Sequence, residues 1–149
     1  MPKPVIFVLN GPNLNLLGER EPDIYGSTTL SDIETNLGKQ AEKLGLSVSC
    51  FQTNEEGELV TLIQKAGKQA SGLILNAGAY THTSVALFDA LQPLAIPVME
   101  VHLSNIFRRE SFRHHSFVSP ASEAIICGLG ADGYSIALKS LAKIIKKKG

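Results

Sequence analysis

The chain has 149 residues, of which 44% are hydrophobic and 19% charged, and its formal net charge is zero. This length fits one domain with a substantial core, so we expect a single domain over residues 1–149. The neutral charge argues against a large nucleic-acid-binding surface, and no apolar run approaches the ~20 residues that span a bilayer. The first apolar run, "VIFVL", is too short for a signal peptide, so we expect a cytoplasmic protein that contacts neither nucleic acid nor membrane.

Apolar runs typical of buried strands alternate with amphipathic helical patterns along the chain. Strands are expected at 4–10, 46–53, 72–78, 96–104 and 123–130. Helices are expected at 29–45, 57–71, 84–91 and 133–148. The apolar faces of the three longer helices comprise Leu30, Ile33, Leu37, Ala41 and Leu44; Leu59, Leu62, Ile63, Ala66 and Ala70; and Ile136, Leu138, Leu141, Ala142 and Ile145.

This alternation predicts an α/β protein with a parallel sheet that helices cover on both faces. Five strands favour the flavodoxin-like order 2-1-3-4-5, in which the segment 105–120 partly replaces one helix. The two cysteines, Cys50 and Cys127, lie in strand-like runs and are expected to be buried, reduced thiols. They fall on opposite edge strands of the predicted sheet and therefore cannot form a disulfide.

The connection between the first strand and the first helix is unusually long. About eighteen residues separate Asn10 from Thr28, whereas such connections usually contain a handful. The segment begins "NGPNLNLLG", a composition also typical of Asx turns with proline and glycine. It lacks the Gly-Lys-Ser/Thr sequence of a phosphate-binding loop.

Arginine and histidine are confined to a few segments of the sequence. Each of them follows the first strand, follows the third strand, or lies at or after the end of the fourth strand, whereas the ten lysines lie elsewhere. These residues are Arg20, Arg108, Arg109, Arg113, His82, His102, His114 and His115. Open parallel sheets bind ligands at the carboxyl ends of their strands, next to the switch point. Because guanidinium groups bind carboxylates in a bidentate manner, the pattern predicts a site for a small polar ligand at this edge.

Two strand ends carry candidate functional side chains. Asn76 ends the third strand, and His82 precedes the next helix, where free backbone N–H groups can bind an anion or be capped by a nearby Ser or Thr. Glu100 and His102 are two residues apart on the fourth strand, so both point to the same face. A histidine oriented by a carboxylate is a candidate general acid or base.

Two other patterns are better explained by structure than by function. The segment "GLGADG" (128–133) matches the glycine spacing of dinucleotide-binding loops, but the strand and acidic residue of that motif do not follow it. We therefore expect a tight turn between a strand and a helix. The lysine-rich "KIIKKKG" is expected to be the last turn of a helix, where lysine is favourable against the helix dipole, rather than a nucleic-acid or membrane tail.

Three segments together resemble a known family. "NGPNLNLLGEREPDIYG", "NAGAYTHTSVALFDAL" and "EVHLSNIFRRESFRHHSFVSP" are similar to the signature segments of type II 3-dehydroquinate dehydratases, and the closing "GLGADGY" extends the resemblance over essentially the whole chain. The resemblance implies a flavodoxin-like fold, no metal, no organic cofactor and the dehydration of 3-dehydroquinate in the shikimate pathway of aromatic amino acid biosynthesis. Phe107 and Arg108 depart from the usual His-Ala pair, and Phe88 stands where an arginine is common.

The resemblance also implies catalytic roles for residues of this chain. The long segment after the first strand would be a mobile lid, in which Tyr25 is the base and Arg20 supplies positive charge. His102 would protonate the departing hydroxyl, and Glu100 would orient His102. Asn13 would hold a water molecule that stabilises the enolate oxygen.

The implied substrate contacts come from three further segments. Asn76 and the backbone N–H groups of Leu103 and Ser104 would bind the substrate carboxylate. His82 and Arg113 would bind the ring hydroxyls. Asp89 would reach into the site of a neighbouring subunit. The resemblance thereby implies homotrimers that assemble into a dodecamer.

Two other classes of protein remain open on the residues alone. A flavodoxin-like module that binds flavin or a phosphorylated small molecule would use the same edge of the sheet. An interaction protein would expose an apolar stripe and would have no cluster of Arg and His. Neither class accounts for Tyr25, Arg20 and His102 together.

Overall fold

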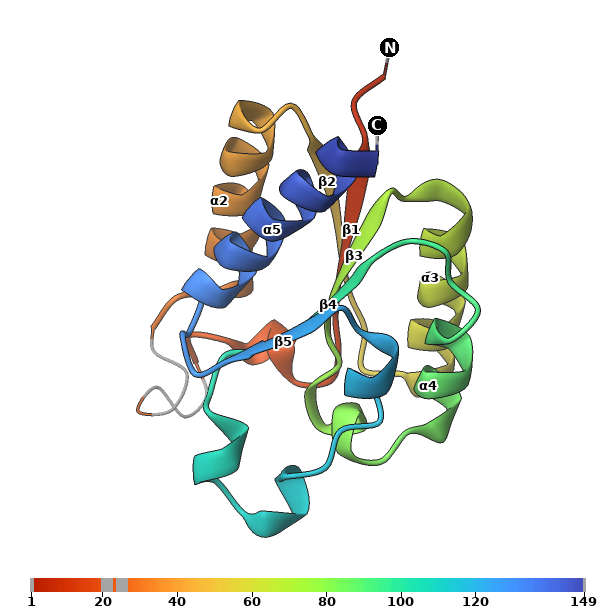
Figure 1. Cartoon of the computed structure of the whole chain (residues 1–149). Helices are drawn as coiled ribbons and strands as arrows, with labels where there is room; N and C mark the ends of the chain where they lie inside the picture. The colour runs from red at the N-terminus through yellow and green to blue at the C-terminus, as the bar shows by residue number, and fades with distance from the viewer. Residues whose placement is uncertain (1, 20–22, 24–26, 149) are drawn as a thin grey trace.

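A computed structural model describes residues 2–19, 23 and 27–148. Its five strands are parallel and form one sheet in the order β2-β1-β3-β4-β5 (Figure 1). The strands are β1 (Val5–Asn10), β2 (Ser47–Gln52), β3 (Gly72–Asn76), β4 (Val98–His102) and β5 (Ala124–Cys127). The predicted flavodoxin-like order is confirmed. It places the switch point between β1 and β3, which run side by side until Asn10 pairs with Asn76.

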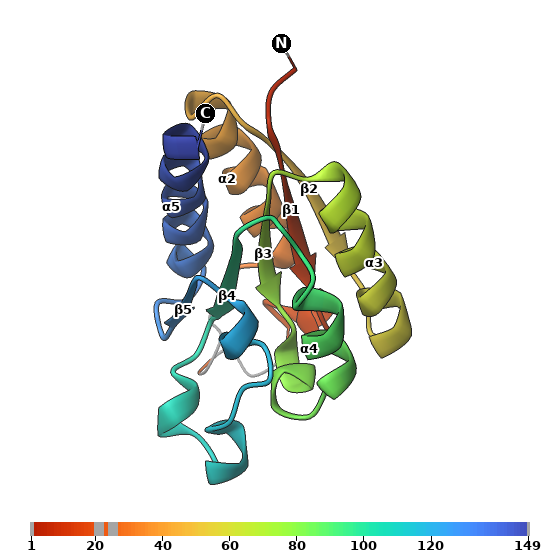
Figure 2. The same ribbon diagram turned by 45° about the vertical axis from the view of Figure 1, so that its right-hand side comes forward.

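Helices cover both faces of the sheet (Figure 2). The pair α2 (Leu30–Lys43) and α5 (Asp132–Lys148) packs on one face, and the pair α3 (Glu56–Gln69) and α4 (Val85–Leu91) packs on the other. Alternate side chains of each strand enter the two cores, as a β-strand requires. In β1, for example, Val8 enters the core under α2 and α5, and Leu9 enters the core under α3 and α4.

Local signals set the ends of α2. The Thr29 hydroxyl accepts a hydrogen bond from the Asp32 N–H, and the Asp32 carboxylate accepts one from the Thr29 N–H, which forms a capping box. After the last turn Gly45 adopts a left-handed φ of 76°. The prediction that Leu44 faces the core is wrong, because the helix ends at Lys43 and the turn buries Leu46 instead.

The inward face of α5 differs from the prediction at one position. Ile136 was expected to face the core but is 42% exposed. Tyr134 and Ala137 are fully buried, together with the predicted Leu138 and Leu141. Because a helix turns about 100° per residue, Ile136 points away from the face that contains Tyr134.

The ends of the strands also differ from the prediction. The fifth strand stops at Cys127 rather than continuing to residue 130, because Gly128 and Gly130 take left-handed φ values of 89° and 60°. This confirms the tight turn expected for "GLGADG". Cys50 and Cys127 are free, as predicted, but half-buried rather than buried, because β2 and β5 are the edge strands.

Short 3-10 helices occupy the connections that follow β1, β3 and β4. These are η1 (Leu14–Leu16), η2 (Gly78–His82), η3 (Ile106–Arg108), η4 (Ser111–Arg113) and η5 (Ser119–Ala121). The last three fill the segment that was expected to replace a helix. In the described part of the chain, no helix is both long and apolar enough to cross a membrane.

Candidate active site

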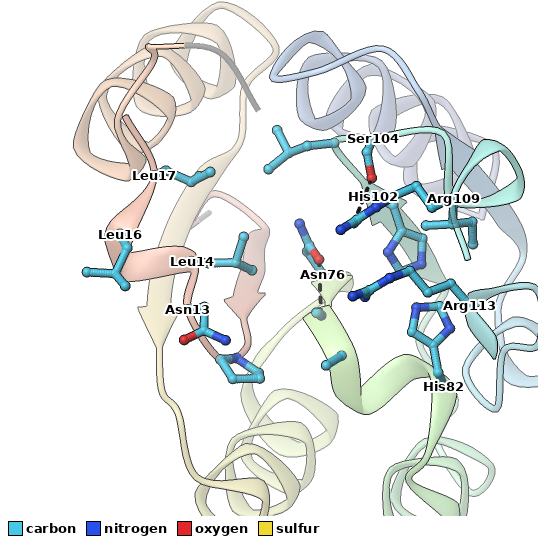
Figure 3. A pocket seen from close by; sticks show the side chains of 15 residues that line it. Asn13, Leu14, Leu16, Leu17, Asn76, His82, His102, Ser104, Arg109 and Arg113 are labelled. Carbon is cyan, nitrogen blue, oxygen red and sulfur yellow. Dashed lines mark hydrogen bonds between the residues drawn. The ribbon is translucent and has the colours of Figure 1, made fainter. Parts of the chain in front are cut away.

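A pocket opens at the carboxyl ends of β1, β3 and β4, beside the switch point (Figure 3). Its volume is about 160 Å³, which suits a ligand smaller than the drug-sized molecules that fill typical pockets. One side is built by the segment after β1, and the opposite side by the segments after β3 and β4. The lining residues are Pro12, Asn13, Leu14, Leu16, Leu17, Asn76, Gly78, Ala79, His82, His102, Leu103, Ser104, Ile106, Arg109 and Arg113.

The segments after β1 and β3 cross in close contact at the base of the pocket. The Gly11 N–H donates to the Asn76 carbonyl over 2.8 Å. A Cβ atom at Gly11 would lie 2.4 Å from the carbonyl oxygen of Ala77, which no side chain tolerates. Glycine is therefore required where the two loops diverge to form the walls of the pocket.

Asn13 stands on the wall that follows β1. Its φ of 70° is left-handed, a conformation that asparagine tolerates better than most residues. The Asn13 N–H donates to Asn54 Oδ1 over 3.1 Å, and Gln52 Nε2 donates to the same oxygen over 3.1 Å. The end of β2 thus holds the backbone of Asn13 and leaves its side chain in the pocket.

The pair of Glu100 and His102 lies on one face of β4, as the spacing predicts. His102 Nε2 and Glu100 Oε2 are 2.6 Å apart, and the side chains are 5% and 0% exposed. Because the carboxylate binds Nε2, the other ring nitrogen, Nδ1, remains for a ligand. His102 lines the pocket while Glu100 lies behind it, so the carboxylate orients the imidazole without lining the pocket.

Two serines complete the environment of Glu100. The Ser116 hydroxyl donates to Glu100 Oε2 over 2.8 Å, and the Ser119 hydroxyl donates to Glu100 Oε1. Burial alone would raise the pKa of Glu100, but the hydrogen bonds from His102, Ser119 and Ser116 outweigh it and lower the pKa. Glu100 is therefore ionised at neutral pH although it is fully buried.

His82 faces the pocket beside His102. The two rings are stacked with centroids 6.2 Å apart. His82 Nδ1 donates to the carbonyl of His115 over 2.9 Å, which leaves Nε2 as the acceptor that can face a ligand. Burial lowers the pKa of His82, and the nearby His102 and Arg113 lower it further, so the ring is neutral at neutral pH.

Asn76 sits at the base of the pocket and is only 2% exposed. Its Oδ1 accepts the Gly78 N–H over 3.2 Å, and its Nδ2 donates to the Tyr134 hydroxyl over 2.9 Å. The amide group is thus fixed from both ends. A second Nδ2 proton is left to meet a ligand in the pocket.

Two arginines give the pocket a positive rim. Arg113 Nε lies 2.9 Å from the Glu110 carboxylate, and an Arg109 terminal nitrogen donates to the Ser104 hydroxyl over 3.3 Å. Both guanidinium groups line the pocket, whereas Arg108 and His114 do not. A pair of guanidinium groups favours an anionic ligand.

The pocket brings together most residues that the sequence singled out. The predicted site residues that line it are Asn13, Asn76, His82, His102, Leu103, Ser104 and Arg113. Asp89 does not line the pocket of its own chain but is exposed on α4. Arg20 and Tyr25 lie outside the described residues.

Sequence reasoning did not identify every part of the pocket. Arg109 was in the arginine cluster but had no assigned role, and its place beside Ser104 emerges only from the fold of the segment after β4. The three leucines of "NLNLL" form an apolar wall. Their unusual density in a polar loop is the signal that could have found them.

These features define an open parallel α/β protein with a cationic pocket at its switch point and a buried carboxylate–histidine pair on one wall. A model of the dehydroquinase class II family matches residues 4–142. The chain belongs to this family.

Relatives and solved structures agree with that assignment. The chain is 58% identical over 138 residues to a protein of Rhodopseudomonas palustris named 3-dehydroquinate dehydratase, with 92% of this chain and 91% of the relative covered. It superposes on the type II dehydroquinase from Propionibacterium acnes with a TM-score of 0.90 at 45% identity, covering 93% and 96% of the two chains. The type II dehydroquinase from Butyrivibrio crossotus gives a TM-score of 0.91 at 40% identity, covering 93% and 97%.

Proposed function

We propose that this chain is a 3-dehydroquinate dehydratase that removes water from 3-dehydroquinate through an enolate and releases 3-dehydroshikimate. The observation that carries the proposal is the buried Glu100–His102 pair on the wall of a cationic pocket, in a chain of the class II family. Such a pair can deliver a proton to a leaving hydroxyl. The reaction belongs to the shikimate pathway of aromatic amino acid biosynthesis.

The substrate carboxylate would bind at the base of the pocket. Asn76 supports this role because its amide is fixed by Gly78 and Tyr134 with one N–H to spare. The backbone N–H groups of Leu103 and Ser104 would complete the site where β4 ends. The cationic rim lowers the free energy of an anion in this position.

The ring hydroxyls would bind at the opposite wall. His82 is suited to accept a hydrogen bond at Nε2, since its Nδ1 is occupied by the His115 carbonyl. Arg113 would donate to a second hydroxyl, and its guanidinium is held in place by Glu110. A ligand bound at both ends would present the carbon next to its ketone to the open side of the pocket.

The reaction would begin when Tyr25 removes a proton from that carbon. A free tyrosine has a pKa of about 10 and is mostly protonated at neutral pH. The positive charge of Arg20 would favour the phenolate, and closure of the lid would exclude screening water. The electrons of the broken C–H bond move toward the ketone oxygen, and a water held by Asn13 would stabilise the resulting enolate.

In the second step the enolate re-forms the ketone and expels the hydroxyl as water. The His102 imidazolium would supply the proton from Nδ1, while its Nε2 proton stays on the bond to Glu100. The new carbon–carbon double bond is conjugated with the ketone. His102 and Tyr25 therefore end the cycle with opposite changes in protonation, and proton exchange with solvent restores both.

The assembly belongs to the same proposal. Asp89 would contact the site of a neighbouring subunit, which is compatible with its exposed position on α4. Trimers would then form a dodecamer. An interface that completes each site would couple activity to assembly.

Ultraviolet absorbance tests the function because only the product is a conjugated enone. We expect purified chain and 3-dehydroquinate to generate this absorbance without added cofactor. His102→Gln should reduce the rate by at least about 100-fold, while His114→Gln, outside the pocket, should not. Borohydride added with substrate should leave activity intact and add no mass, since no step passes through a lysine Schiff base. No change in absorbance, or a substrate-sized adduct, would reject the proposal.

A further inference from the structure

Tyr134 links the base of the pocket to the helix that closes the chain. Its side chain is fully buried in the first turns of α5. Its hydroxyl accepts a hydrogen bond from Asn76 Nδ2 over 2.9 Å and donates one to Asn10 Oδ1 over 2.5 Å. The carboxyl ends of β1 and β3 are therefore joined through one hydroxyl group from a distant part of the sequence.

The direction of these bonds is fixed. The Gly78 N–H can only donate, so it holds Asn76 Oδ1 on its side and turns Nδ2 toward Tyr134. The hydroxyl must then accept from Asn76 and pass its own proton to Asn10. Burial raises the pKa of Tyr134 well above its ordinary value, so this proton stays in place.

The same closing segment also contacts the other half of the pocket base. The N–H of Gly130 donates to the Leu103 carbonyl over 2.9 Å, and the N–H of Gly128 donates to the His102 carbonyl over 3.3 Å. Residues 128–134 therefore touch both the Asn76 amide and the backbone at the end of β4. The segment "GLGADGY" therefore supports the base of the pocket, although its glycine spacing resembles that of a dinucleotide-binding loop.

We propose that Tyr134 is a positioning residue that aims the Asn76 amide at the carboxylate of the substrate. The inference rests on the proposed function, because it assumes that a carboxylate binds at Asn76. Tyr134 contacts no ligand itself, since it does not line the pocket. It acts by removing the freedom of Asn76 to rotate away from its binding orientation.

The substitution Tyr134→Phe isolates this role. It keeps the ring in the core but leaves Asn76 with a single constraint and one more N–H without an acceptor. The hydrogen bond from Asn76 to the substrate carboxylate is present both in the bound substrate and in the transition state. Weakening it should therefore raise KM and leave kcat nearly unchanged. We expect KM to rise about tenfold, the effect of weakening one hydrogen bond to a charged group.

A matched variant separates positioning from stability. Leu138 lies one turn further along α5 and is equally buried. Leu138→Val should lower the unfolding temperature as Tyr134→Phe does but leave KM unchanged. If the parent is active and Tyr134→Phe has the same KM, the positioning role of Tyr134 is overturned and the proposed function stands. An inactive parent would overturn the proposed function and this inference with it.

Inhibition by a stable ring acid tests the link to the carboxylate. Quinate has a hydroxyl in place of the ketone of the substrate and keeps the carboxylate. The amide of quinate, in which a carboxamide replaces the carboxylate, has the same ring but no negative charge. Tyr134→Phe should weaken inhibition by quinate about tenfold and inhibition by the carboxamide far less. Equal losses for both ligands would contradict the inference. If Tyr134→Phe does not fold, Asn10→Leu removes the acceptor of the Tyr134 proton, so the hydroxyl is no longer held in place for Asn76, and the same difference between the two ligands is expected.

Discussion

Replacing Ser119 by alanine should destabilise the ionised form of the buried Glu100 carboxylate, which orients His102. Glu100 is fully buried and accepts hydrogen bonds from His102, Ser116 and Ser119. Ser119→Ala removes one of these three donors without opening the core, because Ser119 is itself half-buried. A hydrogen bond to a charged group contributes about 2 kcal/mol, so the unfolding temperature at pH 7 should fall by roughly 4–8 °C.

The effect should depend on pH in a defined direction. Three donors hold the pKa of Glu100 below its ordinary 4.5, so its ionisation stabilises the folded chain above that pH. This stabilisation is lost as the pH falls through the pKa of the folded state. Ser119→Ala raises this pKa, so the stability difference between variant and parent should be largest near pH 7 and should shrink on acidification.

Ser122→Ala is the matched control. Ser122 is also half-buried in the same segment, but its hydroxyl donates to the Val118 carbonyl rather than to Glu100. Thermal unfolding from pH 3 to 7 and steady-state kinetics should be measured for both variants. Ser119→Ala should lower kcat about tenfold through a less well-oriented His102. If the stability loss of Ser119→Ala does not vary with pH and its kcat equals that of Ser122→Ala, Ser119 does not support the ionised Glu100 carboxylate.

Three further outcomes can be measured on single variants. Affinity for the substrate should weaken below pH 6.5 as His82 becomes charged, since its pKa lies below that value, and His82→Asn should abolish this step in the pH profile of kcat/KM; a step that survives would belong to another group. Gly11→Ala should lower the free energy of unfolding by about 1–3 kcal/mol, because its Cβ would meet the Ala77 carbonyl. Gly38→Ala should raise the free energy of unfolding, because Gly38 lies in the middle of α2 and its Cβ would meet nothing within 4 Å. Chemical denaturation that shows a change of the same sign for both variants would contradict this expectation. Asp89→Ala should reduce both activity and assembly, and an unchanged sedimentation coefficient with full activity would reject its role between subunits.

The fold could be predicted because two periodicities alternate along the whole chain. Apolar runs such as "GLILN" have no polar face and therefore indicate strands buried on both sides. Two errors have different causes. Leu44 continues a helical pattern beyond the last turn of α2, where periodicity has little weight. Ile136 lies within α5, but its apolar character does not show that it faces away from the sheet.

Part of the site could also be predicted from position alone. Strand ends in a parallel sheet meet at one edge, so Asn76 and His102 had to lie close together once the strand order was known. Tyr134 could not be assigned in this way. Its partners lie 58 and 124 residues away in the sequence, and only the packing of α5 on the sheet brings them together.

The role of Tyr25 as the base is tested by the rate at which purified Tyr25→Phe converts 3-dehydroquinate, followed by the absorbance of the enone. Tyr80→Phe is the control, because it also loses a tyrosine hydroxyl, one that donates to the Asn54 carbonyl and does not line the pocket. We expect the parent to form the enone, Tyr80→Phe to be nearly as fast, and Tyr25→Phe to be slower by at least about 100-fold, the usual loss for a missing general base. A parent that forms no enone would rule out the proposed reaction, and a Tyr25→Phe variant as fast as Tyr80→Phe would rule out Tyr25 as the base.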